Sequence, residues 1–154
     1  IQAQILELLR DLSERIAMST LLITHDLGVV AEMASRVVVM YAGRTVEEGP
    51  VAALLAAPRH PYTAGLLGAV PRLGESASGA VRQPLAEIPG TVPLVREPHA
   101  ACAFAPRCPL AEDRCRQHLP PLETVGTGHR SACFRHADVA DLMARTRRDA
   151  GATA

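Results

Sequence analysis

The sequence has no tryptophan and only two tyrosines and two phenylalanines, so aromatic residues make up 3% of its 154 residues. A hydrophobic core must therefore be built mainly from Leu, Val, Ile and Ala, and the hydrophobic share of 48% is enough for one. An excess of either charge is missing too, because 16 basic residues balance 16 acidic ones. A neutral balance gives no reason to expect nucleic acid or an anionic membrane as a partner.

Longer patterns are missing as well. No apolar run is long enough to span a bilayer, and the chain opens without the regions of a signal peptide. The phosphate-binding run G-x-x-x-x-G-K-[ST] does not occur, and the glycine-rich part from Gly74 to Gly79 lacks its lysine. We therefore expect a soluble, cytosolic chain without a P-loop of its own.

The first part of the chain alternates between helical and strand patterns, which predicts an α/β fold. Apolar residues at three- and four-residue steps predict a helix from Ile1 to Ile16. Ser19–Thr24 is short, apolar and typical of a buried parallel strand. Asp26 is placed to cap a helix that follows it.

The pattern becomes irregular in the second part. The remaining predicted elements are a hairpin of Arg36–Tyr41 and Arg44–Glu48 around Ala42-Gly43, helices over Val51–Ala57 and Tyr62–Val70 with Pro61 in the first turn, and a short helix from Asp138. Residues 71–84 are rich in Gly, Ser and Ala and are typical of a linker. Regular periodicity is then missing up to residue 133, so a cross-link or a metal would have to hold this segment.

All four cysteines lie in that irregular segment, at Cys102, Cys108, Cys115 and Cys133. Four thiolates are the ligand set of an iron–sulfur cluster or of a structural zinc. The spacing is neither that of zinc ribbons nor a common ferredoxin spacing, so it does not name the metal.

Other interpretations of the cysteines remain open at this point. Two disulfides do not suit a cytosolic chain, whereas unligated buried thiols do occur in such proteins. For zinc, nearby histidines are possible substitutes for a thiolate: His99, His118, His129 and His136.

A polar pair, His25-Asp26, directly follows the strand predicted over Ser19–Thr24. Ligand-contacting residues of α/β sheets lie at such strand ends. A lone histidine there is otherwise a capping or packing residue, so His25 is only a candidate on this pattern.

Four stretches together resemble one family: the helix from Ile1, LLITHDLGVVAEMASRVVVMYAGRTVEEGP, RHPYT at 59–63, and the segment around PRCPLAEDRC. The resemblance is to the ATP-binding subunits of dipeptide and oligopeptide ABC importers, including the related nickel importers. It implies the C-terminal part of a P-loop ABC ATPase domain followed by a small, irregular, cysteine-rich extension. The implied division is 1–58 for the nucleotide-binding domain, 59–137 for the extension and 138–154 for a tail.

The resemblance also implies roles for single residues. His25 falls on the switch histidine, which hydrogen-bonds the γ-phosphate of ATP, so ATP with Mg is the implied cofactor of the intact protein. The four cysteines fall on a motif that holds a [4Fe-4S] cluster in some members of the family. With the resemblance we therefore expect Cys102, Cys108, Cys115 and Cys133 to bind a cluster, with zinc as the alternative.

The implied function is that of an ATP-hydrolysing, energy-coupling subunit that drives an importer for peptides or nickel. Its partners would be membrane-embedded permease subunits, a second ABC ATPase subunit and, indirectly, a solute-binding protein. It would lie peripherally on the cytoplasmic face of the inner (plasma) membrane. The alternative function is a free-standing metal-binding interaction module.

The family's P-loop, signature motif and catalytic Glu do not occur in this sequence, so we expect a C-terminal fragment that does not hydrolyse ATP alone. The first prediction is that the isolated chain binds ATP negligibly, because His25 offers one phosphate contact where a nucleotide needs a cradle of amides. Calorimetric titration with Mg-ATP tests this. Binding in the micromolar range would show that the prediction is wrong.

Overall fold

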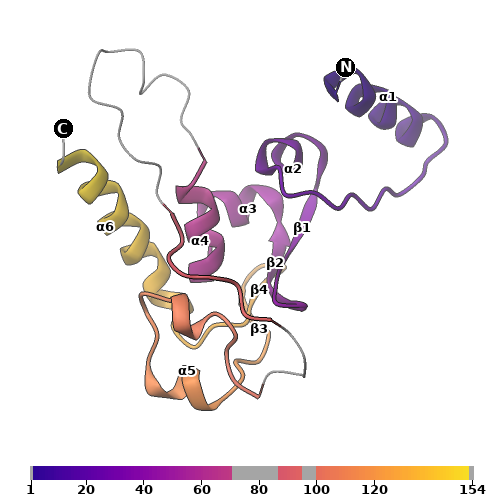
Figure 1. The fold of residues 1–154 in the computed structure, drawn as a ribbon. Helices are drawn as coiled ribbons and strands as arrows, with labels where there is room; N and C mark the ends of the chain where they lie inside the picture. Colours follow the sequence, from indigo (N-terminus) through magenta and orange to yellow (C-terminus); the bar gives the residue numbers. More distant parts are fainter. Residues whose placement is uncertain (1, 71–86, 95–99, 153–154) are drawn as a thin grey trace.

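The computed structural model describes residues 2–70, 87–94 and 100–152. It opens with two separate helices, α1 (Gln2–Arg15) and α2 (Leu27–Met33), which lie at one end of the molecule (Figure 1). Asp26 caps α2, since its carboxylate accepts hydrogen bonds from the backbone amides of Gly28 at 2.8 Å and Val29 at 3.2 Å. Both predicted helices and the predicted cap are confirmed.

The strand predicted over Ser19–Thr24 is wrong. This stretch connects α1 and α2 without strand structure, and Leu21 and Ile23 are 89% and 90% exposed. A buried strand needs a neighbour to pair its backbone groups and cover its side chains. The sheet in the described part of the chain includes no strand from this stretch.

That sheet is small and antiparallel throughout, with the order β1-β2-β4-β3. Its strands are β1 (Arg36–Tyr41), β2 (Arg44–Pro50), β3 (Glu123–Gly126) and β4 (His129–Ser131). The β1–β2 hairpin is confirmed, and its turn has positive φ at Ala42 (47°) and Gly43 (76°), as tight hairpins require. The sequence did not predict β3 and β4, which consist of only four and three residues.

The other described helices complete the fold. They are α3 (Val51–Ala56), α4 (Pro61–Gly68), η1 (Ala105–Arg107), α5 (Asp113–Gln117), η2 (His136–Asp138) and α6 (Val139–Ala152). The helices predicted from Val51, from Pro61 and near Asp138 are therefore confirmed. The linker predicted over 71–84 lies outside the described residues. Among the described helices, none is both long and apolar enough to cross a membrane.

The core is aromatic despite the scarcity of aromatic residues. Tyr41, Val46 and Phe104 form its buried centre, and Tyr62 packs against it. The ring centroids of Tyr41 and Phe104 are 5.2 Å apart in an edge-to-face arrangement, and those of Tyr41 and Tyr62 are 4.7 Å apart. The rings of Tyr41, Tyr62 and Phe104 thus pack β1, α4 and the segment before η1 against one another.

The sheet joins residues on both sides of position 58, where we predicted a domain boundary. Glu47 and Glu48 of β2 pair with Ser131 and Arg130 of β4. The amide of Ala132 donates to the carbonyl of Val46 at 2.8 Å. The residues after position 58 therefore share a sheet with the hairpin.

A fully buried carboxylate lies at this junction. Glu47 is 0% exposed and accepts hydrogen bonds from the amides of Arg59 at 2.6 Å and His60 at 3.0 Å. Its Oε1 also lies 2.7 Å from Nε2 of His129, which is buried as well. One side chain of β2 thus connects the start of α4 with β4.

The second prediction is that Glu47→Ala lowers the free energy of unfolding by about 3 kcal/mol, because two buried amides and one imidazole lose their acceptor. Urea unfolding of the full chain measures it. The matched control is Glu48→Ala, which removes a partly exposed 3.0 Å pair with Arg130 and should cost about 1 kcal/mol or less. Equal losses in the two variants would contradict the role assigned to Glu47.

Candidate metal centre

The four cysteines come together in the structure although they lie on different short elements. Cys102 precedes η1, Cys108 follows it, Cys115 lies in α5 and Cys133 follows β4. All four line one narrow cavity of about 10 Å³, the space of a single water probe. The amide of Cys102 donates to the carbonyl of Cys115 at 3.0 Å, so these two segments are also joined by their backbones.

The remaining wall of this cavity is mostly apolar. Besides the cysteines it consists of His60, Pro61, Phe104, Ala105, Leu110, Pro120, Phe134 and Arg135. Across the described residues, no group of three or more His, Cys, Asp and Glu side chains is arranged so that it could hold a metal ion. The four cysteines therefore line a common cavity, but their side chains are not arranged to hold a metal ion in the described structure.

Burial keeps the thiols of Cys102, Cys108 and Cys133 protonated in the absence of a metal. Desolvation raises the pKa of Cys102, and it raises the pKa of Cys108 to about 11 and that of Cys133 to about 12. Neighbouring cysteines act in the same direction, because each thiolate would repel the next. A bound cation would remove both costs, and its binding would release protons.

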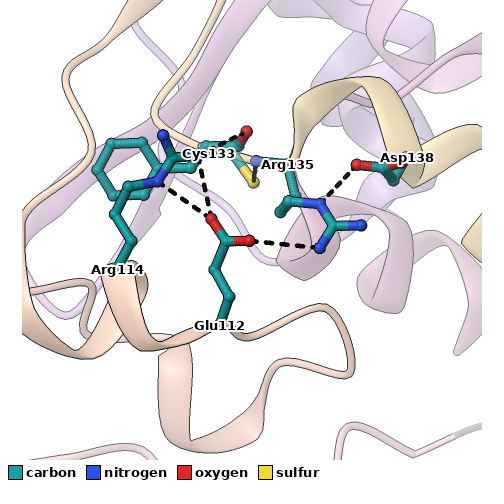
Figure 2. Close-up of polar contacts among 6 residues, drawn as sticks. Glu112, Arg114, Cys133, Arg135 and Asp138 are labelled. Carbon is teal, nitrogen blue, oxygen red and sulfur yellow. Dashed lines mark hydrogen bonds and ion pairs between the residues drawn. The ribbon is translucent and has the colours of Figure 1, made fainter.

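Charged side chains at and around the cavity wall hold the loop that carries Cys133. Figure 2 shows Glu112 between Arg114 and Arg135, at 3.0 Å and 3.4 Å, and Arg135 reaching Asp138 at 2.7 Å. The amide of Arg135 donates to Sγ of Cys133 at 3.3 Å. This network ties α5 to η2 and directs a backbone donor at a sulfur.

A match to a known family covers most of this site. Residues 46–115 match the family described as the oligopeptide/dipeptide transporter, C-terminal region. This stretch is thus similar to the C-terminal region of oligopeptide and dipeptide transporters. The match includes Glu47, His60 and the first three cysteines, whereas Cys133 lies beyond its end.

Relatives extend the similarity over most of the chain. The dipeptide transport ATP-binding protein DppD of Escherichia coli is 45% identical over 138 residues, which are 90% of this chain and 41% of the relative. A protein of Brucella ovis, named as a peptide import ATP-binding protein, is 50% identical over 141 residues, 91% of this chain and 42% of the relative. The oligopeptide transport ATP-binding protein OppD of Mycobacterium bovis is 50% identical over 135 residues, 88% of this chain and 21% of the relative. The chain thus spans 42% or less of these relatives.

The structure places a histidine in the wall of the cysteine cavity, although the sequence analysis interpreted this residue only as part of a helix start. His60 is 1% exposed and is the N-cap of α4, where its Nδ1 accepts the amide of Tyr62 at 3.1 Å. Burial lowers its pKa to about 4, so the ring is neutral at pH 7. The one signal in the sequence was the position of His60 directly before Pro61, since a residue there caps the helix that the proline opens.

The histidines considered for zinc do not face the cavity in the described structure. His129 lies against Glu47, His118 is exposed and His136 is half-buried on η2. None of these three is among the residues that line the cavity. His99 lies outside the described residues.

His25 lies apart from the cysteines in the chain and in the fold. It is exposed and directly precedes Asp26, the cap of α2, at the end of the molecule opposite α5 (Figure 1). An exposed imidazole at a helix start can meet an anion, but its role toward ATP stays a prediction.

Proposed function

We propose that this chain forms part of the ATP-binding, energy-coupling subunit of an ABC importer for peptides. The observation that carries the proposal is the family match over 46–115, together with 45–50% identity to ATP-binding proteins of peptide and dipeptide transport. Residues 1–58 would complete a nucleotide-binding domain, 59–137 would be its extension, and 138–154 a helical tail. Nickel is the second solute class that the resemblance allows.

The first helix supports this division. The apolar residues of α1 and of the stretch after it are largely exposed: Ile5, Leu8, Leu12, Ile16, Met18, Leu21 and Ile23. Such a continuous apolar row needs a cover in the working protein. The body of an ABC ATPase domain would supply that cover, and with it the phosphate cradle that this sequence lacks.

Within this proposal His25 contacts the γ-phosphate of Mg-ATP. Its place before a capped helix supports the assignment, because the same end carries the exposed apolar row that an ATPase domain would cover. The partners would be the permease subunits, a second ATPase subunit and indirectly a solute-binding protein, with the subunit on the cytoplasmic face of the membrane.

The third prediction tests this function in the complete ATP-binding protein assembled with its permease. His25→Ala should lower ATP hydrolysis about 100-fold, since one hydrogen-bond donor to a developing charge contributes that much. His118→Ala, at an exposed position of the extension, is the matched control and should leave hydrolysis unchanged. If His25→Ala hydrolysed ATP as fast as His118→Ala, the proposed contact of His25 with the γ-phosphate would be wrong.

We also propose that the four cysteines hold a [4Fe-4S] cluster. The donor set fits, because four thiols reach one apolar cavity, and backbone amides lie near three of the sulfurs, as they do around such clusters. A single zinc ion needs four sulfurs at about 2.3 Å from one point, whereas a cluster binds each thiolate to a different iron. The resemblance is what places the cluster ahead of zinc, and a bound cluster would serve as a structural or redox-sensing centre.

The fourth prediction is that the full chain, purified without oxygen, contains about four irons and a matching amount of sulfide. Cys108→Ser should lose the metal and the visible absorption. Ala111→Ser, which adds the same hydroxyl beside the cavity wall, is the control and should keep both. One zinc per chain would make zinc the correct alternative, and a metal-free chain would leave the cysteines as packing residues.

A further inference from the structure

A second cavity, about 320 Å³ in volume, is lined by α4, α6 and the segments around Ile88 and Phe104. Small-molecule sites in proteins have volumes of about 300 to 1,000 Å³, so this cavity is large enough for a small ligand. Most of its wall is apolar and includes Ala64, Ile88, Phe104, Leu142 and Met143. Three polar side chains also belong to the wall: Glu87, Arg107 and Thr146.

The wall is held in place by contacts within the protein. Helix α6 packs against α4, on which the segment around Ile88 also lies (Figure 1). Ile88 approaches α4 at Gly65, where an added Cβ would be only 2.9 Å from two of its side-chain atoms. Arg107 donates to the carbonyls of Pro89 at 2.7 Å and Ile88 at 2.8 Å. A preformed cavity of this kind binds a ligand without a large cost of ordering.

A positive and a negative side chain share this wall. Glu87 directly precedes Ile88, whose carbonyl accepts a hydrogen bond from Arg107, so the carboxylate and the guanidinium belong to one part of the wall. A guanidinium has five N–H donors, so Arg107 can bind a carboxylate in addition to its protein acceptors. Opposite charges beside an apolar surface are complementary to a ligand with an amine, a carboxylate and an apolar side chain. A fatty acid or an apolar amine would leave one of the two charges without a counterpart.

We propose that this cavity binds short peptides or free amino acids with apolar side chains, in their zwitterionic form. Arg107 contacts the carboxylate of the ligand and Glu87 contacts its amine. The apolar side chain lies against Phe104 and Met143. The site needs neither ATP nor a permease nor a metal, so it goes beyond the function proposed above.

The fifth prediction concerns the full chain titrated calorimetrically with leucyl-leucine. A ligand of this size should bind with a Kd between about 0.1 and 1 mM. N-acetyl-leucyl-leucine, which lacks the amine, should bind about fivefold more weakly. Leucyl-leucine amide, which lacks the carboxylate, should bind about tenfold more weakly. Leucine distinguishes the two sources, because binding at least as tight as that of leucyl-leucine would identify the ligand as a free amino acid, and weaker binding as a peptide.

Two kinds of variant locate the site. Thr146 is exposed on α6 and lines the cavity, so Thr146→Trp should fill part of it and weaken leucyl-leucine binding more than about tenfold. Ala144→Trp is the matched control, because Ala144 is exposed on the same helix but is not among the lining residues. Glu87→Gln should weaken leucyl-leucine binding about fivefold and leave binding of the N-acetylated peptide unchanged.

Three results would overturn the inference. The first is no binding of leucyl-leucine by the wild type at about 10 mM. The second is equal binding of the free and the two capped peptides, because the charges would then have no role. The third is an equal loss of binding in Thr146→Trp and Ala144→Trp, because the ligand would then bind elsewhere. These titrations contain no nucleotide and no permease, so a failure of the proposed transport function would not change their outcome.

A measurement on the wild type covers the case in which the variants do not fold. The chain has four methionines, all in its described part: Met18, Met33, Met40 and Met143. Only Met143 among them lines the cavity, so leucyl-leucine should shift the methyl resonance of Met143 and leave the other three unchanged. A shift at the exposed Met18 or Met40 instead would show binding to another apolar surface and would overturn the inference.

Discussion

The described structure depends on one buried carboxylate. Glu47 lies on the predicted hairpin, yet its hydrogen bonds reach the start of α4 and the strand β4, 12 and 82 residues further along the chain. A buried charge is tolerated only when donors surround it, so these segments must arrive together. The pairing of β2 with β4 occurs at the same place, because Glu47 itself is paired with Ser131. The cysteine cavity lies next to this junction, because His60, whose amide donates a hydrogen bond to Glu47, also lines the cavity.

The irregular segment after residue 100 gains its order from this junction and from side chains, since it has little regular structure of its own. Phe104 packs it into the aromatic core, and the pairs of Glu112, Arg114 and Arg135 hold the loop around Cys133. A metal bound by the four thiolates would add a cross-link at the place where these loops meet. Protein packing and a bound metal would thus act on the same few backbone segments.

Several local features were predictable because short-range physics decides them. Asp26 caps α2, Pro61 opens α4, and Ala42-Gly43 forms a hairpin turn, each as expected from residue type and position. The prediction of a strand over Ser19–Thr24 was wrong. Its apolar pattern indicates that these residues favour burial, but it does not tell whether a neighbouring strand is present to pair with them. Strands β3 and β4 were missed because four and three residues carry too little periodicity.

The sequence by itself indicated the resemblance to peptide-importer ATP-binding subunits, the short helices and the four cysteines as one set of candidate ligands, since these depend on residue identity and spacing. The tertiary structure alone decided that the four thiols line one cavity and that His60, rather than His118, His129 or His136, lies in its wall. It also decided that Glu47 is the buried member of the Glu47-Glu48 pair. The physical reason is that burial and proximity depend on contacts between distant segments, which no local pattern contains.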